Sequence, residues 1–263
     1  MADNGSAILT EDYLVTSTEM KSVADAIREK GGTTEQLMFP DGFISAVESI
    51  QSGGGGGAKE PYIEETYDAN GDLIDVNLVG YTVIRDYAFY NCSKLALTSL
   101  PSGITNIRDY AFYACSKLAL TSLPSRLISI GVNAFFACTS LALTSLPSGI
   151  TNISKGTFNS CIKLDLTSLP SGLISIGTNA FIGCTKLALT SLPSGLTSIG
   201  ASAFLNCTGL KSITFQGKPN SIDSTAFKGC TNLKTINVPW ASGEVANAPW
   251  GATNATINYN YTG

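Results

Sequence analysis

Hydrophobic residues recur along this chain with a period of 23 residues, from residue 84 to about residue 244. Each of the seven repeats carries an Ile eight residues before a Cys, a Phe three residues before it and a Leu three residues after it. In the third repeat these residues are Ile130, Phe135, Cys138 and Leu141. A period in the twenties predicts a solenoid, because each repeat can bury its apolar face only against its neighbours.

The order of polar and apolar positions inside one repeat predicts its local structure. Residues 118–124, Leu-Ala-Leu-Thr-Ser-Leu-Pro, predict a short strand that the Pro ends, and residues 125–130 predict a second short extended piece. Residues 131–138 are too few for a full helix and predict one helical or 3-10 turn. We therefore expect a β-solenoid of short parallel strands and helical or 3-10 turns, with coils about 4.8 Å apart.

All cysteines of the chain fall on one position of the repeat. They are Cys92, Cys115, Cys138, Cys161, Cys184, Cys207 and Cys230. Disulfide frameworks use even numbers of cysteines and metal sites use short paired spacings, whereas this count is odd and the spacing is one whole coil. Side chains on stacked coils run parallel, which does not suit disulfide geometry. We expect a buried ladder of structural thiols beside a ladder of Phe rings, and no metal site.

The segments outside the repeats predict further parts. Residues 1–52 predict a small α-helical head with two short helices, and residues 53–60 form a Gly-rich linker. Residues 61–83 predict a β-hairpin around an Asn-Gly pair, which covers the open edge of the first coil. The seven repeats occupy residues 84–244, and residues 245–263 predict a final strand that closes the stack.

The predicted head has a consequence for assembly. Two short helices within about fifty residues rarely bury enough apolar surface to fold alone. We therefore expect the apolar faces of residues 1–52 to pack on another chain, either a sibling subunit, as in a homotrimer, or a different protein. A small autonomous helical hairpin is the alternative.

Charge is divided unevenly along the chain. Residues 1–83 hold 4 Lys/Arg and 15 Asp/Glu, a net charge of −11, whereas residues 84–240 hold 12 Lys/Arg and 4 Asp/Glu, a net charge of +8. An acidic head on a basic body suggests a different partner for each, although acidic helices can also serve solubility alone. No apolar run predicts a membrane span, and the first residues lack the pattern of a secretory signal.

Candidate catalytic chemistry is sparse. The chain has no His, which excludes Ser-His-Asp and Cys-His nucleophile systems, and the Gly run at residues 53–57 lacks the Lys-Ser/Thr ending of a phosphate loop. Asp86 and Asp109 share a repeat position, so they should stack about 5 Å apart, the separation of a retaining glycosidase. No cleft is implied there, and salt-bridged stacking with Arg85 and Arg108 is the interpretation we favour. We expect no enzyme activity and no cofactor.

Residues that vary while the repeat stays fixed are the candidates for binding. The aromatic candidates gather in the first three repeats: Tyr87, Tyr90, Tyr110, Tyr113 and Phe136. The basic candidates share another repeat position and predict a positive row: Lys94, Lys117, Lys163 and Lys186. Aromatic residues are typical of interface cores and sugar platforms, and a basic row could attract anionic glycopolymers. The aromatic residues could instead pack on the hairpin or the head. Specific nucleic-acid binding is not expected, because the basic row lacks interleaved aromatic residues.

The repeat resembles the BspA-like leucine-rich repeat family, whose pattern is Ile-Gly-x-x-Ala-Phe-x-x-Cys-x-x-Leu followed by Leu-Pro. Residues 176–187, Ile-Gly-Thr-Asn-Ala-Phe-Ile-Gly-Cys-Thr-Lys-Leu, match every signature position. Repeats one, two and four depart at the Gly, where Arg85, Arg108 and Ser154 stand, and Thr157 replaces one Ala. The resemblance implies a leucine-rich-repeat β-solenoid that binds protein or glycan at surfaces.

A second resemblance concerns the flanks. Residues 20–47 and 238–257 are similar to the terminal modules of tail or minor structural proteins of phages and prophages from Gram-positive hosts. It implies a virion protein that binds a host cell-surface protein or glycopolymer and contacts other tail or baseplate proteins through residues 1–52. The alternative is a BspA-like adhesin or interaction module on a bacterial cell surface.

Overall fold

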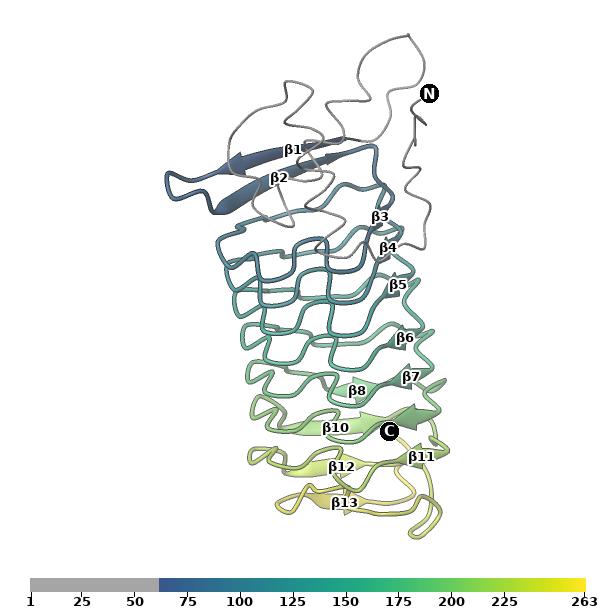
Figure 1. Ribbon diagram of the computed structural model, residues 1–263. Helices are drawn as coiled ribbons and strands as arrows, with labels where there is room; N and C mark the ends of the chain where they lie inside the picture. Colours follow the sequence, from purple (N-terminus) through teal and green to yellow (C-terminus); the bar gives the residue numbers. More distant parts are fainter. Residues whose placement is uncertain (1–61) are drawn as a thin grey trace, which may run out of the picture. The chain divides into compact units, whose positions relative to one another are not determined.

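The computed structural model describes residues 62–263, which belong to the second of two compact units, residues 56–263. These residues form a stack of coils with a hairpin at one end and a short strand at the other (Figure 1). The parallel-stranded leucine-rich-repeat solenoid predicted from the 23-residue period is confirmed. The predicted helical head, residues 1–52, and the Gly-rich linker, residues 53–60, lie outside the described residues.

Short parallel strands connect the coils into two columns. One column contains β3 (Val83–Ile84), β4 (Asn106–Ile107), β5 (Ser129–Ile130), β6 (Asn152–Ile153), β7 (Ser175–Ile176), β9 (Ser198–Ile199) and β11 (Ser221–Ile222). The other contains β8 (Ser191–Leu192), β10 (Ser212–Phe215), β12 (Thr235–Asn237) and β13 (Thr256–Asn258). Paired residues within the seven repeats are one period apart, as in the pairing of Ile176 with Ile199, whereas β12 and β13 pair residues 21 apart.

An antiparallel hairpin precedes the first coil. It consists of β1 (Tyr62–Tyr67) and β2 (Leu73–Val79). The Ala96 amide of the first coil donates to the Ile74 carbonyl of β2 at 2.9 Å, and in the next coil Ala119 donates to Leu97 at the same distance. Strand β2 therefore satisfies the backbone groups that a preceding coil would satisfy.

The helical or 3-10 turn predicted for residues 131–138 is wrong. Those residues form successive hydrogen-bonded turns, and no helix is present in residues 62–263. Asn133 and Ala137 have positive φ angles of 51° and 56°. Because a left-handed residue every fourth position interrupts right-handed winding, a helix cannot propagate through this segment.

The strand predicted for residues 118–124 is also wrong. That segment makes one ladder bond to the preceding coil and then bends at Thr121, ahead of Pro124, which has no amide hydrogen. Strand β10 occurs at the equivalent place in the sixth coil, where Gln216 replaces Pro and donates to the Leu192 carbonyl at 3.0 Å. The loss of Pro therefore lengthens the strand.

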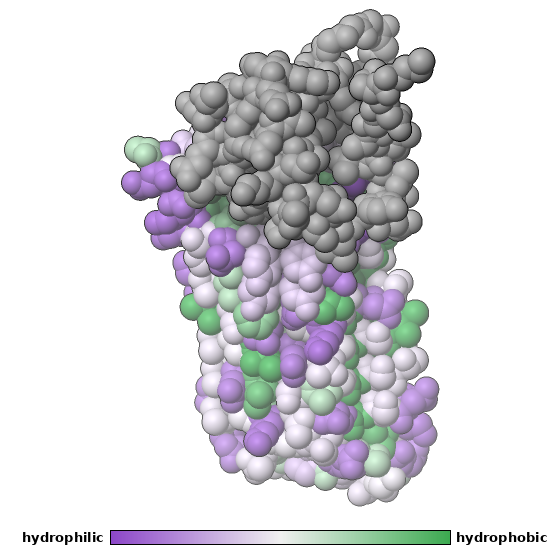
Figure 2. Space-filling model, in the orientation of Figure 1, coloured by the Kyte–Doolittle hydropathy of each residue, from purple (hydrophilic) through white to green (hydrophobic). Residues whose placement is uncertain are grey.

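The core contains the predicted ladder of Phe rings. From Phe89 to Phe227 the seven rings stack with centroids 5.1–5.7 Å apart and interplanar angles of 3–18°. Hydrophobic residues also form patches that follow the stack on the coloured part of the visible face (Figure 2). Stacking of this kind lets every coil bury its Phe, Ile and Leu residues on both neighbours.

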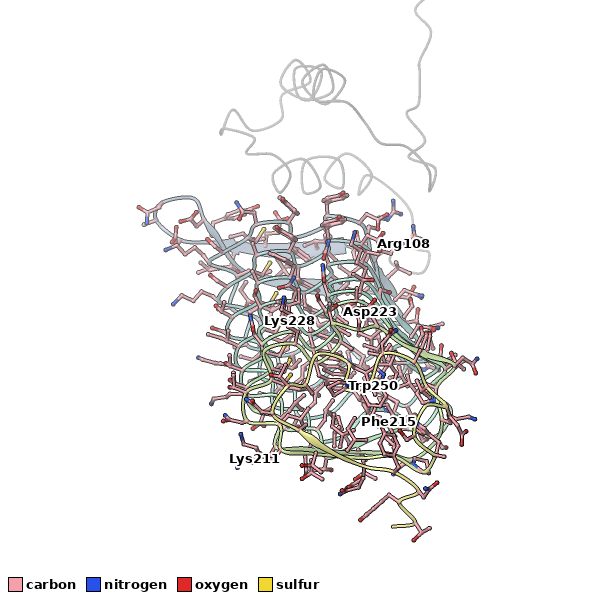
Figure 3. The ribbon with its side chains drawn as sticks, turned by 90° about the horizontal axis from the view of Figure 1, so that it is seen from below. Arg108, Lys211, Phe215, Asp223, Lys228 and Trp250 are labelled. Carbon is pink, nitrogen blue, oxygen red and sulfur yellow. The ribbon has the colours of Figure 1, made fainter. Side chains whose placement is uncertain are left out.

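The last coil is covered by a cluster of large aromatic rings. Trp250 is fully buried, and its ring centroid lies 6.0 Å from that of Phe215 and 6.3 Å from that of Trp240. Seen along the stack, Phe215 and Trp250 lie inside the coil and Lys211 lies at its rim (Figure 3). The Trp250 carbonyl accepts the Phe227 amide at 2.8 Å, so the cluster also satisfies backbone groups of the last coil.

Candidate interaction surface

Five of the predicted binding residues form one surface, which we call the aromatic panel: Tyr87, Tyr90, Tyr110, Tyr113 and Phe136. The panel has two columns of stacked rings. Tyr87 stacks on Tyr110 with centroids 4.9 Å apart, while Tyr90, Tyr113 and Phe136 stack in series at 4.8 and 4.5 Å. The columns touch through tilted pairs at 5.6 and 5.8 Å. The structure therefore brings together the residues that the sequence spaces one period apart.

The backbone of the first column is unusual for its side chains. Tyr87 and Tyr110 have φ angles of 59° and 56°. The same position on the next three coils carries Asn133, Gly156 and Asn179, with φ between 51° and 62°. Asn and Gly suit the left-handed region, whereas bulky residues are outliers there. The tyrosines thus occupy strained positions, which is a feature that clusters at functional sites.

The panel is open to solvent at its first coil. Tyr87 is 48% exposed and Tyr90 is 41% exposed, while the tyrosines of the second coil and Phe136 are half-buried. The rings are nearly parallel to their neighbours, with interplanar angles of 2–13° along the columns. Each ring therefore has at least one face against a neighbouring ring, and Tyr113 has a ring on both faces.

The carboxylates beside the panel serve the fold. Asp86 Oδ1 accepts the Asp109 amide at 2.8 Å, and Asp109 Oδ1 accepts the Val132 amide of the next coil at 2.7 Å. The predicted salt-bridged stacking with the neighbouring arginines is therefore wrong, because both carboxylates bond the backbone of the following coil. This arrangement does not match two carboxylates facing a sugar across a cleft.

The four predicted lysines do not form a continuous row. All are exposed, but Ser140 stands at the equivalent position of the third coil, so Lys94 and Lys117 are separated from Lys163 and Lys186. The first pair lies on the two coils that carry the panel tyrosines. Asp68 of the hairpin has a lowered pKa, mainly because the Asp72 and Asn70 amides donate to it, with a smaller contribution from the positive charge of Lys94.

The predicted thiol ladder is confirmed. Six of the seven cysteines are buried and Cys92 is half-buried. From Cys115 onward, each Sγ donates to the carbonyl of the Phe 26 residues earlier, on the preceding coil, at 2.9–3.1 Å. Burial raises the pKa of Cys161 well above its ordinary value, and it raises that of Cys230 to about 11. The protonated thiols therefore connect the coils and are poor nucleophiles.

The described residues offer little else that resembles a small-molecule site. A shallow hollow of about 480 Å³ lies along the fifth to seventh coils, between Ser175 and Asn247, and none of the predicted binding residues lines it. Residues 62–263 contain no cluster of metal-ligating side chains. No helix among them is long and apolar enough to cross a bilayer.

These features define a repeat protein with an exposed aromatic surface, in which the regular positions build the rod and the variable positions face the solvent. The model for the BspA type leucine rich repeat region matches in six copies, over residues 66–188 and 151–248. The chain therefore belongs to the BspA-type leucine-rich repeat family. No curated protein sequence matches it.

Crystal structures of bacterial leucine-rich repeat proteins are similar to this chain. The T. pallidum leucine-rich repeat protein is 27% identical over 67% of this chain and 81% of that chain, with a TM-score of 0.46. One from Bacteroides ovatus is 25% identical over 67% of this chain and 58% of that chain, with a TM-score of 0.39. A leucine rich cell surface protein from Faecalibacterium prausnitzii is 23% identical, over 69% and 70%, with a TM-score of 0.31. Since all three TM-scores are below 0.5, family membership rests on the repeat match.

Proposed function

We propose that this protein is an adhesin-like interaction module of a bacterial surface that binds a macromolecular partner through the aromatic panel. The observation that carries this proposal is the pair of tyrosines, Tyr87 and Tyr110, at left-handed positions where the next three coils have Asn or Gly and the sixth has the small residue Ser202. Exposed clusters of tyrosine are typical of interface cores, and a binding role gives a reason for keeping them despite the backbone cost. Membership of the BspA-type family supports the surface location and the non-catalytic role.

The tail-associated role stays a prediction. It rests on residues 20–47 and 238–257, and the first of these segments lies outside the described residues. The same holds for a virion location, for contacts of residues 1–52 with tail or baseplate proteins and for a homotrimer. Genes for tail proteins beside the coding sequence would favour this alternative.

Binding by the full chain to an array of immobilised matrix proteins, host-cell proteins and wall glycopolymers tests the proposal. We expect the Tyr90→Ser/Tyr113→Ser variant to lose at least about tenfold in affinity for whatever the native chain binds. The matched control is Ile128→Ser/Ile174→Ser, which removes two exposed apolar side chains from another repeat position. Equal binding by the native chain and the tyrosine variant would overturn the proposal.

A further inference from the structure

Two arginines border the aromatic panel. Arg85 and Arg108 share one position on the first and second coils, and both are exposed. Arg85 begins the turn that carries Tyr87, since the Ala88 amide donates to the Arg85 carbonyl at 3.3 Å. Within residues 62–263, neither guanidinium group has an ion-pair or hydrogen-bond partner. Each therefore has donors available for a partner molecule next to the tyrosines.

Arg85 and Arg108 are exposed cations beside the panel, and several charged groups around them have other contacts. Asp86 and Asp109 direct an oxygen at backbone amides of the following coil. On the other side of the panel, Lys94 lies near the acidic tip of the hairpin, where its charge contributes to the lowered pKa of Asp68 after the two backbone hydrogen bonds. The two exposed guanidinium groups therefore give the panel a cationic border that an anionic group can bind.

The stacking of the panel reduces the ring surface that is open to a neutral sugar. Sugars stack on the open faces of aromatic rings, but every ring of the panel has at least one face against a neighbouring ring 4.5–4.9 Å away. Ring edges, tyrosine hydroxyls and the outer faces of Tyr87 and Tyr90 remain for a partner. Tyrosine and arginine, with tryptophan, are the residue types enriched at the energetic hot spots of protein interfaces.

The spacing of the two arginines indicates the partner's chemistry. Adjacent coils are separated by about the same distance as the stacked rings, 4.9 Å for Tyr87 and Tyr110. Acidic residues whose Cβ atoms lie about 5–6 Å apart occur at positions i and i+4 of a helix, and on facing residues of paired strands. A guanidinium group binds a carboxylate through two parallel hydrogen bonds.

We propose, resting on the proposed function of the panel, that the partner is a polypeptide surface with two acidic side chains one helical turn or one strand pair apart. Arg85 and Arg108 bind the two carboxylates, and the exposed edges of Tyr87 and Tyr90 contact the residues between them. Acidic glycans and neutral glycans are the competing ligand classes.

A random peptide library selected against the immobilised full chain tests this inference. We expect the enriched peptides to contain two Asp or Glu residues three or four positions apart beside an apolar residue. Their affinity should fall at least tenfold for Arg85→Glu/Arg108→Glu and also for the milder Arg85→Gln/Arg108→Gln. The control Lys211→Glu/Lys234→Glu makes the same change in net charge on exposed residues of the sixth and seventh coils and should bind as the native chain does.

Several results would overturn the inference. One is enrichment of neutral or basic peptides, or of none. Another is an equal loss in the lysine control, which would show non-specific electrostatic attraction. The third is tighter binding of dextran sulfate or of neutral oligosaccharides than of any selected peptide. If selected peptides lose affinity for the Tyr90→Ser/Tyr113→Ser variant and keep it for the arginine variants, the proposed function of the panel stands and the acidic partner does not.

Discussion

The ring of Tyr87 lies parallel to the ring of Tyr110, with centroids 4.9 Å apart and 2° between their planes. A stacked pair contributes about 0.5–1.5 kcal/mol beyond burial, whereas a left-handed backbone costs a residue with a side chain about 1–2 kcal/mol. Because the one stack is shared by two left-handed residues, it offsets only part of their combined backbone cost. The pair therefore adds little to the free energy of unfolding, which is consistent with residues kept for binding.

Replacement of both tyrosines by Asn, the residue of the third coil at this position, should separate stability from binding. We expect Tyr87→Asn/Tyr110→Asn to change the free energy of unfolding by less than about 1 kcal/mol, measured by urea denaturation. Binding to the partner should fall at least tenfold. A loss of stability above about 3 kcal/mol, the size of a core truncation, would instead assign the tyrosines to packing.

The thiol ladder should contribute to stability through its hydrogen bonds. Cys161 donates to the Phe135 carbonyl at 3.0 Å and is completely buried. We expect Cys161→Ala to cost about 2 kcal/mol, because it removes a hydrogen bond and leaves a small void. Cys92→Ala, at the half-buried first position, is the matched control and should cost less. Equal effects of the two changes in thermal unfolding would contradict this role of the ladder.

The buried thiols should also make stability depend on alkaline pH. Burial is the main cause that raises the pKa of Cys138 and Cys184 above the ordinary 9.0, and it raises the pKa of Cys230 to about 11. Above pH 9 the unfolded thiols lose protons that the folded thiols keep, so the free energy of unfolding falls as pH rises. The contribution is fully present below pH 9.

Denaturation between pH 8 and 10 measures this effect. The loss should approach about 1.4 kcal/mol per pH unit for each buried thiol, and Cys161→Ala should reduce the slope by that amount. An identical slope in the native chain and the variant would show that the thiol does not ionise on unfolding.

Two adjacent positions of the third coil test the alignment of the stack. Leu141 is fully buried, whereas Ala142 is half-buried, and the residue one period after Ala142 is Asp165. Leu141→Asp should cost several kcal/mol because it buries an unpaired charge. Ala142→Asp should be tolerated, with less than about 1 kcal/mol lost. Similar melting temperatures for the two variants would contradict the alignment.

The repeat also predicts which deletions are tolerated. Removal of residues 146–168 takes out 23 residues and joins Ser145 to Leu169, which restores the Thr-Ser-Leu-Pro sequence. We expect this shorter chain to fold with one coil fewer and to unfold cooperatively, because each coil contacts only its neighbours. Removal of residues 146–169 shifts the register by one residue and should prevent folding. Circular dichroism distinguishes the two outcomes.

The period of the sequence contains most of the fold, because apolar residues that recur at one interval can be buried only by stacking. The period says less about the backbone conformation of the segments between those apolar residues. Ala137 has a φ of 56° although Ala has no preference for the left-handed region, so the turns at residues 131–138 could not be distinguished from one turn of helix. Pro124 was the signal in the sequence against a full strand at residues 118–124, because proline cannot donate a backbone hydrogen bond to a ladder.

The residues of the candidate site could be predicted from the sequence, but their geometry could not. The spacing of 23 residues places Tyr90 and Tyr113 on adjacent coils, and the structure stacks them at 4.8 Å. That the ring faces cover each other depends on side-chain orientation, which the repeat does not specify. The gap at Ser140 in the lysine positions is visible in the sequence. The spacing alone did not indicate that Arg85 and Arg108 border the aromatic panel.

The ratio of dissociation constants between the Tyr90→Ser/Tyr113→Ser variant and the native chain tests the central claim most directly. It should be measured with a partner found on the array, with both proteins shown by circular dichroism to be folded and with Ile128→Ser/Ile174→Ser as the reference. We predict a ratio of at least about ten for the tyrosine variant and a ratio near one for the reference. A ratio near one for both variants would show that the partner binds elsewhere and would contradict the assignment of the aromatic panel.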